Sequence, residues 1–199
     1  MSGRPLARRF YARDSRQLAP LLLNKVLVRG TGPDRVEARI VEVEAYAGAD
    51  DPGSHAFRGP TPRNETMFGP PGHLYVYFTY GMHWCANVVC GQAGTASAVL
   101  LRAGSPLVGV DLIRQRRGHR TDRELCAGPA RLTQALGITG IDDGTDLVRG
   151  TIRILDDGVP PPSRPGRSAR IGLREGRGDQ HPWRWFVRND PNLSRTRHP

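Results

Sequence analysis

Lysine, cysteine and long apolar runs are all scarce in this chain of 199 residues. Lys25 is the only lysine, and we expect it at the solvated start of a strand. Cys85, Cys90 and Cys126 are odd in number and lack the spacing of zinc ligands, which predicts small buried thiols in a reducing compartment. No apolar run approaches the roughly 20 residues of a membrane span, and no signal-peptide core follows the first residues. The sequence therefore predicts a cytoplasmic protein that holds no metal.

Positive charge is what the chain has in excess. Its formal net charge is +10, and nearly all of its cations are arginines. An excess of this size implies an anionic partner. Nucleic acid is the first candidate, which predicts association with the nucleoid. An anionic membrane surface ranks second, because no stretch combines an apolar stripe with a basic face. A soluble protein whose charge only aids solubility ranks third.

Apolar and polar residues alternate over several short segments, as is typical of an antiparallel sheet. We expect strands at residues 24–29, 36–45, 73–80, 83–90, 96–103, 151–155, 169–173 and 185–187. Helical spacing predicts helices at residues 18–23, 106–117 and 125–136. Residues 1–16 are predicted as a loose basic arm and residues 189–199 as a polar tail. The length and the pattern predict one α+β domain over residues 1–199, which we expect to be a monomer.

The second predicted strand ends in acidic residues. Strand side chains alternate between two faces, so Glu42, Glu44 and Tyr46 share one face. An acid at a strand end beside an aromatic ring is a candidate general base. A surface carboxylate paired with Arg35 or Arg39 fits Glu44 equally well. The pattern alone does not separate Glu44 from Glu42.

Aromatic side chains surround a long loop at residues 47–71, and a loop of this length is usually functional or disordered. Tyr46, His55 and Tyr77 are candidates for stacking on a flat ring, although packing on the sheet surface is the commoner fate of a strand tyrosine. Tyr80 precedes a Gly-Met pair at the tip of a predicted hairpin, where an aromatic ring gains no core burial. In a basic protein, this position favours insertion between stacked bases.

Several short motifs follow one another along the chain. They are IVEVEAY (40–46), TPRN (61–64), LYVY (74–77), YGM (80–82), CAN (85–87), VLLRA (99–103), CAGP (126–129), LTQAL (132–136) and RIG (170–172). Together they resemble the alkyladenine (3-methyladenine) DNA glycosylase family, in its bacterial form. The resemblance implies a curved antiparallel sheet with flanking helices and a protruding β-hairpin, similar to the C-terminal domain of methionyl-tRNA formyltransferase.

The resemblance also implies roles for particular residues. The implied catalytic pair is Glu44, the general base that activates water, and Arg102, which helps to hold that water. The residues implied around a flipped base are Tyr46, His55 and Tyr77, which sandwich it, Asn87, which disfavours guanine, and Ile171, whose carbonyl contacts the water. The residues implied at the DNA are Tyr80 and Met82, which intercalate, and Arg63, which contacts the backbone.

The predicted helix start at residues 128–131 is a second candidate for DNA contact. Gly128 and the residues after it offer free amides at the positive end of a helix dipole, and Arg131 adds a charge. These features suit a backbone phosphate. The alternative is an ordinary helix start.

The function that follows is a monofunctional glycosylase that excises damaged purines from double-stranded DNA in base-excision repair, without a cofactor. Cationic 3-methyladenine and 7-methylguanine are the easiest leaving groups, and hypoxanthine and ethenoadenine are further candidates. Nicking the strand would need an amine nucleophile. Lys25 lies outside the motif cluster of residues 39–102, and no proline follows Met1, so we expect attack by water and no lyase activity. The alternative is a non-catalytic nucleic-acid-binding module of the same fold, because fold and charge alone fit both.

Overall fold

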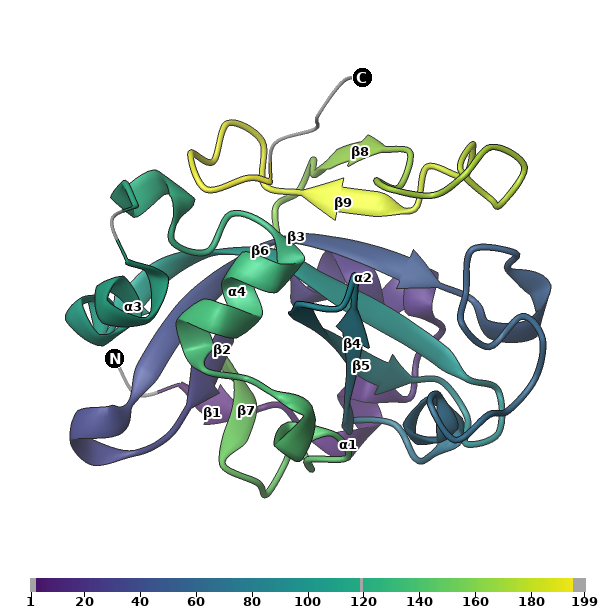
Figure 1. Cartoon of the computed structure of the whole chain (residues 1–199), viewed down its shortest axis with the longest axis horizontal. Helices are drawn as coiled ribbons and strands as arrows, with labels where there is room; N and C mark the ends of the chain where they lie inside the picture. Colours follow the sequence, from purple (N-terminus) through teal and green to yellow (C-terminus); the bar gives the residue numbers. More distant parts are fainter. Residues whose placement is uncertain (1–2, 119, 195–199) are drawn as a thin grey trace.

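The computed structural model describes residues 3–118 and 120–194. Within them, nine strands form one antiparallel sheet in the order β1-β7-β2-β3-β6-β5-β4, with β9 beside β3 and β8 beside β9 (Figure 1). The strands are β1 (Arg4–Pro5), β2 (Val26–Arg29), β3 (Val36–Tyr46), β4 (Leu74–Thr79), β5 (His83–Cys90), β6 (Ser97–Val108), β7 (Ile152–Asp156), β8 (Gly166–Ser168) and β9 (Arg184–Phe186). The sheet curls, and short helices flank it. The α+β class and the curved antiparallel sheet are confirmed, whereas kinship with the formyltransferase domain stays a prediction.

Strand β3 carries the acids that the sequence singled out. Its first four residues (36–39) pair with β2, residues 42–44 pair with β9, and β6 pairs along the opposite edge. The register with β6 shifts on either side of Glu42, and such bulges bend a strand. Glu42 and Glu44 therefore lie between two neighbouring strands, and both side chains are fully buried.

The helices cover the sheet with apolar faces. The α-helices of the described part are α1 (Arg8–Tyr11), α2 (Ser15–Leu22), α3 (Val110–Arg117) and α4 (Pro129–Leu136). The 3-10 helices there are η1 (Gly32–Asp34), η2 (Gly48–Asp50), η3 (Glu65–Phe68), η4 (Asp122–Glu124) and η5 (Gly140–Asp142). Helix α2 packs on β3 and β6, and α4 packs on β5 and β6. Leu18 and Leu22 of α2 join Leu132 and Leu136 of α4 in one buried core.

The N-terminal segment is not the loose arm predicted for residues 1–16. Strand β1 pairs with β7, and α1 follows it. Arg8 donates to a carboxylate oxygen of Asp146 at 2.6 Å, and the Tyr11 ring is fully buried. These partners lie far along the chain, so local composition did not reveal them. Residues 1–2 lie outside the described residues.

The polar tail predicted at residues 189–199 is also wrong for its first part. Asn192 and Ser194 are buried, and Ser194 hydrogen-bonds to Glu42 in the middle of the sheet. The segment is polar because it satisfies buried charge. Residues 195–199 lie outside the described residues.

Several predicted boundaries are shifted. The helix predicted at 106–117 begins only at Val110, because β6 continues to Val108 and Gly109 then turns the chain at a φ of +69°. The helix predicted at 125–136 begins at Pro129. No strand forms at 169–173, since the pairing with β9 is made by β8 instead. Lys25 is not solvated: it is buried, and its Nζ lies 2.8 Å from an Asp156 carboxylate oxygen.

Strands β4 and β5 form a hairpin at one edge of the sheet, and its protrusion toward DNA stays a prediction. Its register pairs Thr79 with His83, and the tip is a tight turn in which the amide of Met82 donates to the carbonyl of Thr79 at 3.2 Å. Tyr80 and Gly81 both adopt positive φ values, +52° and +65°, as the two central residues of a type I′ turn do. In the part of the chain that the structure describes, no helix is long and apolar enough to cross a membrane.

Candidate active site

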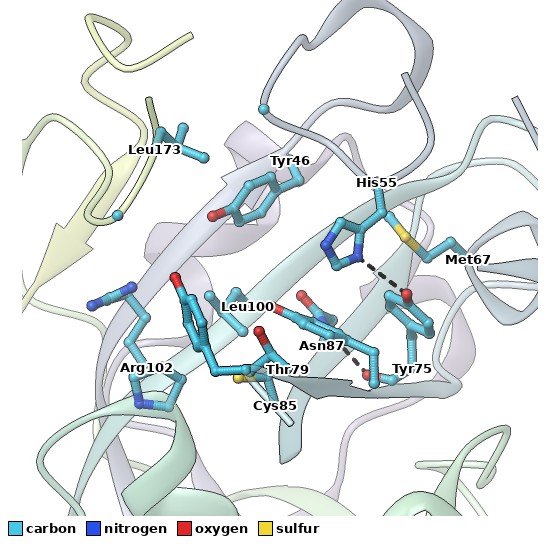
Figure 2. A pocket seen from close by; sticks show the side chains of 15 residues that line it. Tyr46, His55, Met67, Tyr75, Thr79, Cys85, Asn87, Leu100, Arg102 and Leu173 are labelled. Atoms are coloured by element: carbon cyan, nitrogen blue, oxygen red, sulfur yellow. Dashed lines mark hydrogen bonds between the residues drawn. The ribbon is translucent and has the colours of Figure 1, made fainter. Parts of the chain in front are cut away.

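A cavity of about 220 Å³ opens beside the end of β3. This volume is below that of sites for drug-sized ligands, about 300–1,000 Å³, and suits one small planar ligand. Its walls combine aromatic rings, an amide and a guanidinium (Figure 2). They are formed by Tyr46, Gly53, His55, Met67, Tyr75, Tyr77, Thr79, Tyr80, Cys85, Asn87, Leu100, Arg102, Pro129, Gly172 and Leu173.

Glu44 is buried next to the wall residues Tyr46 and Arg102, and donors from three segments hold it there. Its Oε1 accepts from the backbone amide of Ile171 at 2.8 Å and lies 3.1 Å from Nη1 of Arg102. Its Oε2 accepts from the hydroxyl of Tyr46 at 3.0 Å. An ionised carboxylate offers about four acceptor positions, so these three described donors leave capacity for one more. Glu44 is thus fixed in orientation and can still accept one further hydrogen bond.

The structure bears on the two open questions about the strand acids. Arg35 pairs with Glu37 and Arg39 pairs with Asp157, so neither makes Glu44 a surface carboxylate. Neither Glu42 nor Glu44 lines the cavity itself, but Glu42 contacts one wall residue, Arg102, whereas Glu44 contacts two, Tyr46 and Arg102. Glu44 therefore has more contact with the wall than Glu42, and its role as the general base stays a prediction.

Glu42 is the centre of a buried charge cluster. Its Oε1 accepts from Nε of Arg102 at 2.8 Å and from Nε of Arg184 at 2.7 Å. The hydroxyl and the amide of Ser194 donate at 2.6 and 2.7 Å. Burial disfavours the charged form, but the two arginine charges outweigh that effect and hold the pKa of Glu42 below its usual value. Glu42 thereby anchors Arg102, whose Nη1 lies close to Glu44.

The aromatic residues predicted to stack on a ring line the same cavity. The ring centroids of His55 and Tyr77 are 4.5 Å apart with planes at 81°, and Nδ1 of His55 lies 3.2 Å from the hydroxyl of Tyr75 (Figure 2). Burial and the nearby charge of Arg63 lower the pKa of His55, so the ring stays neutral at pH 7. Burial raises the pKa values of Tyr46 and Tyr77, which keeps both hydroxyls protonated.

Some wall residues were missed by the sequence reasoning. Tyr75 orients His55, and its two-residue spacing from Tyr77 is the signal that could have revealed it. Cys85 and Leu100 come from β5 and β6, and Met67 comes from η3. Their apolar character gives no local signal, because a core side chain has the same pattern. Asn87, which was predicted, donates to the carbonyl of Tyr75 at 3.3 Å.

The residues predicted to insert into DNA or contact its backbone lie at or near the tip of the β4–β5 hairpin. Tyr80 lines the cavity with part of its side chain and is 82% exposed, and Met82 beside it is 68% exposed. Arg63 donates to the carbonyl of Phe78 at 2.9 Å, and its guanidinium lies 5.6 Å from the Tyr77 ring centroid. Arg63 therefore supports the hairpin as well as presenting charge.

The helix start is less open than the sequence suggested. Gly128 is buried with a φ of +136° and precedes Pro129, which reaches the cavity. Arg131 lies 3.6 Å from a carboxylate oxygen of Glu124, and both side chains are partly exposed. Phosphate binding by Gly128 and Arg131 stays a prediction. In the residues described, no group of three or more His, Cys, Asp or Glu side chains could hold a metal ion.

The fold and the site define a small α+β protein with a buried acid–arginine cluster against the wall of a small aromatic cavity. The chain belongs to the methylpurine-DNA glycosylase (MPG) family, whose family model matches residues 9–191. It is thus a DNA glycosylase with a role in the repair of DNA damage, and DNA is its substrate.

Curated relatives agree with this family. A protein of Burkholderia cenocepacia (strain HI2424) is 55% identical over 188 residues, which cover 93% of this chain and 88% of the relative. One of Streptomyces avermitilis is 52% identical over 194 residues, which cover 96% and 91%. One of Carboxydothermus hydrogenoformans is 47% identical over 191 residues, which cover 96% and 98%. All three carry the name "Putative 3-methyladenine DNA glycosylase".

Proposed function

We propose that this protein is a monofunctional glycosylase that rotates an alkylated purine out of duplex DNA and hydrolyses its N-glycosidic bond with a water activated by Glu44. The observation that carries the proposal is the position of Glu44. Its carboxylate is buried directly against the cavity wall, where Tyr46, Arg102 and the Ile171 amide orient it. A module that only bound nucleic acid would have no need of an acid in this place.

Base rotation is supported by the hairpin tip. A base inside a duplex cannot present its glycosidic bond to water, and extruding it costs a few kcal/mol. Tyr80 is 82% exposed at the hairpin tip and lines the cavity. Its ring would fill the space that the base leaves and restore stacking with the neighbours.

The walls suit a purine that carries positive charge. Tyr46 and Tyr77 present electron-rich rings, and a cation gains from lying over such a ring. His55 stays neutral, so it adds no repulsive charge. Purines methylated at N3 or N7 are cations, which makes 3-methyladenine and 7-methylguanine the substrates proposed first. Hypoxanthine and ethenoadenine are neutral and would depend more on hydrogen bonds near His55 and Asn87.

The chemistry follows from the charge of the leaving group. A cationic purine takes the electrons of the breaking C1′–N bond and leaves neutral, and the sugar becomes oxocarbenium-like. The carboxylate of Glu44 stabilises that positive charge. A water oxygen then bonds to C1′ as Glu44 takes its proton. In this proposal the Arg102 guanidinium and the Ile171 carbonyl hold that water. The products are a free purine and an abasic sugar in an unbroken strand.

The absence of strand nicking is proposed from the position of Lys25. A lyase needs an amine that attacks the sugar and forms a Schiff base. The Lys25 ammonium is buried, bound to Asp156 at 2.8 Å, and lines no part of the cavity. This arrangement supports water as the nucleophile.

The test is incubation of the protein with a duplex that carries a single 7-methylguanine. The proposal expects release of the purine, a strand that stays intact until it is heated in alkali, and no covalent adduct when borohydride is added during turnover. Binding without release would favour the binding module instead. An adduct that disappears in Lys25→Ala would overturn the water mechanism but keep the glycosylase.

A further inference from the structure

Asp51 and Arg170 form a fully buried ion pair behind one wall of the cavity. Nη1 of Arg170 donates to Oδ2 of Asp51 at 2.6 Å, and Nη2 donates to Oδ1 at 2.7 Å. Both side chains have no exposed surface, and neither residue lines the cavity. Two parallel hydrogen bonds of this length make a strong and directional pair.

The pair joins the segments that form this wall. Asp51 also accepts from the amides of Ala47 and Gly53, which fixes the loop after β3. Arg170 also donates to the carbonyls of Ala45 and Gly178, which fixes the C-terminal segment. The residue after Arg170 supplies the amide that holds Glu44. One ion pair thus positions two loops around the acid.

Arg170 also stacks on Tyr46. Its guanidinium carbon lies 4.6 Å from the Tyr46 ring centroid, and on another side it lies 5.0 Å from that of Trp183. Because Arg170 is buried and Tyr46 lines the cavity, the guanidinium covers the ring face that points away from the cavity. A base stacked on the open face would be separated from the Arg170 charge by one aromatic ring, about 8 Å in all.

A permanent charge at this distance conflicts with a cationic ligand. A bare guanidinium there would repel a methylated purine and draw electron density from the ring that attracts it. Asp51 lies against both terminal nitrogens of Arg170 and opposes its charge. By contrast, Arg63 lies farther from its ring, 5.6 Å from the Tyr77 centroid, and it is exposed, so solvent weakens its charge more than that of a buried arginine.

We propose that Asp51 is a specificity-determining residue, which neutralises Arg170 behind Tyr46 and so allows the cavity to prefer cationic over neutral purines. The inference rests on the proposed function and extends it to a residue that does not touch the base. In this view Arg170 serves to position Tyr46 and the Ile171 segment, and Asp51 removes the electrostatic cost of using an arginine there.

The experiment compares two ligands of the same shape. One is a duplex with 7-methylguanine on a 2′-fluorinated sugar, which resists cleavage; the other carries neutral 7-methyl-7-deazaguanine on the same sugar. Dissociation constants are measured by fluorescence anisotropy at one slightly acidic pH, at which 7-methylguanine keeps its charge. The readout is the affinity ratio of the cationic to the neutral ligand, so a general loss of binding cancels.

Asp51→Asn keeps the shape and removes the opposing charge, so it should lower this ratio by about tenfold. Asp157→Asn is the matched control: Asp157 makes the same two-bond contact to Arg39, away from the cavity, and the ratio should not change. A ratio that is unchanged in Asp51→Asn, or that falls equally in Asp157→Asn, would show that the pair is only structural and overturn the proposal.

A second variant keeps the proposal testable if Asp51→Asn misfolds. Melting curves show whether each variant is folded. Asp51→Asn combined with Arg170→Gln removes both charges, and its ratio should be at or above that of the parent. A ratio well below the parent in this double variant would overturn the proposal even if Asp51→Asn does not fold. Release of 7-methylguanine from ordinary DNA by the parent tests the proposed function separately, so the two failures are distinguishable.

Discussion

Replacing Tyr80 with serine tests how the protein holds a base outside the duplex. The ring is 82% exposed and lies at a hairpin tip, so its loss should change the free energy of unfolding by no more than about 0.5 kcal/mol. In the DNA complex the same ring would stack between bases. Stacking of one base on an aromatic side chain contributes about 1–3 kcal/mol, which corresponds to a loss of roughly 5-fold to 150-fold in affinity.

The assay is single-turnover excision of 7-methylguanine from a duplex and from the same single strand, together with binding to a 2′-fluorinated lesion duplex. Tyr80→Ser should lose more on the duplex, because a single strand has no stack to restore. Tyr80→Phe keeps the ring and should behave like the parent. Ile141→Ser removes another exposed apolar side chain, 89% exposed and outside the cavity, and should change neither substrate. Equal losses on duplex and single strand for Tyr80→Ser would refute the wedge.

Three further predictions follow from the same geometry. Arg63→Ala should raise the pKa of His55 toward its usual 6.5, but burial, the larger cause of its lowering, should keep it below that value in an NMR titration. Burial raises the pKa values of Cys90 and Cys126 to about 12, so both thiols should resist a disulfide reagent at pH 8 until the protein unfolds; fast labelling of the folded protein would contradict this. Binding to undamaged DNA should weaken steeply with salt, and Arg131→Ala should reduce the slope of log K against log salt by about one; an unchanged slope would remove Arg131 from the DNA contacts.

The strands were predictable where their pattern is local. The segment at 83–90 forms β5 with the expected bounds, and 36–45 is one residue short of β3. Alternation of apolar and polar residues reports burial of one face, which a strand acquires wherever its neighbours come from. The helix predicted at 106–117 was wrong at its start because β6 continues past Pro106, through an irregular pairing with β3 that no local pattern shows.

The sequence indicated which residues belong to the candidate site better than it indicated which contacts those residues make. The placement of Glu44 could not be decided from β3 alone, because its partners Arg102 and Ile171 are brought by β6 and by a segment near the C-terminus. The same holds for Ser194, which was assigned to a tail and instead satisfies the buried Glu42. A buried charged side chain needs a partner, which often comes from a distant segment of the chain. The residue types show that such pairs must form, but they do not show which residues form them.

The most direct test of the central claim is the pair Glu44→Gln and parent on a duplex with one 7-methylguanine. Glutamine keeps the shape of the side chain but cannot take a proton from water. The account predicts that Glu44→Gln binds the lesion duplex within a few-fold of the parent and releases no purine above the spontaneous rate, whereas the parent releases it and leaves an alkali-labile site. Release by Glu44→Gln at the parent's rate, with Glu42→Gln inactive, would contradict the assignment of Glu44 as the base.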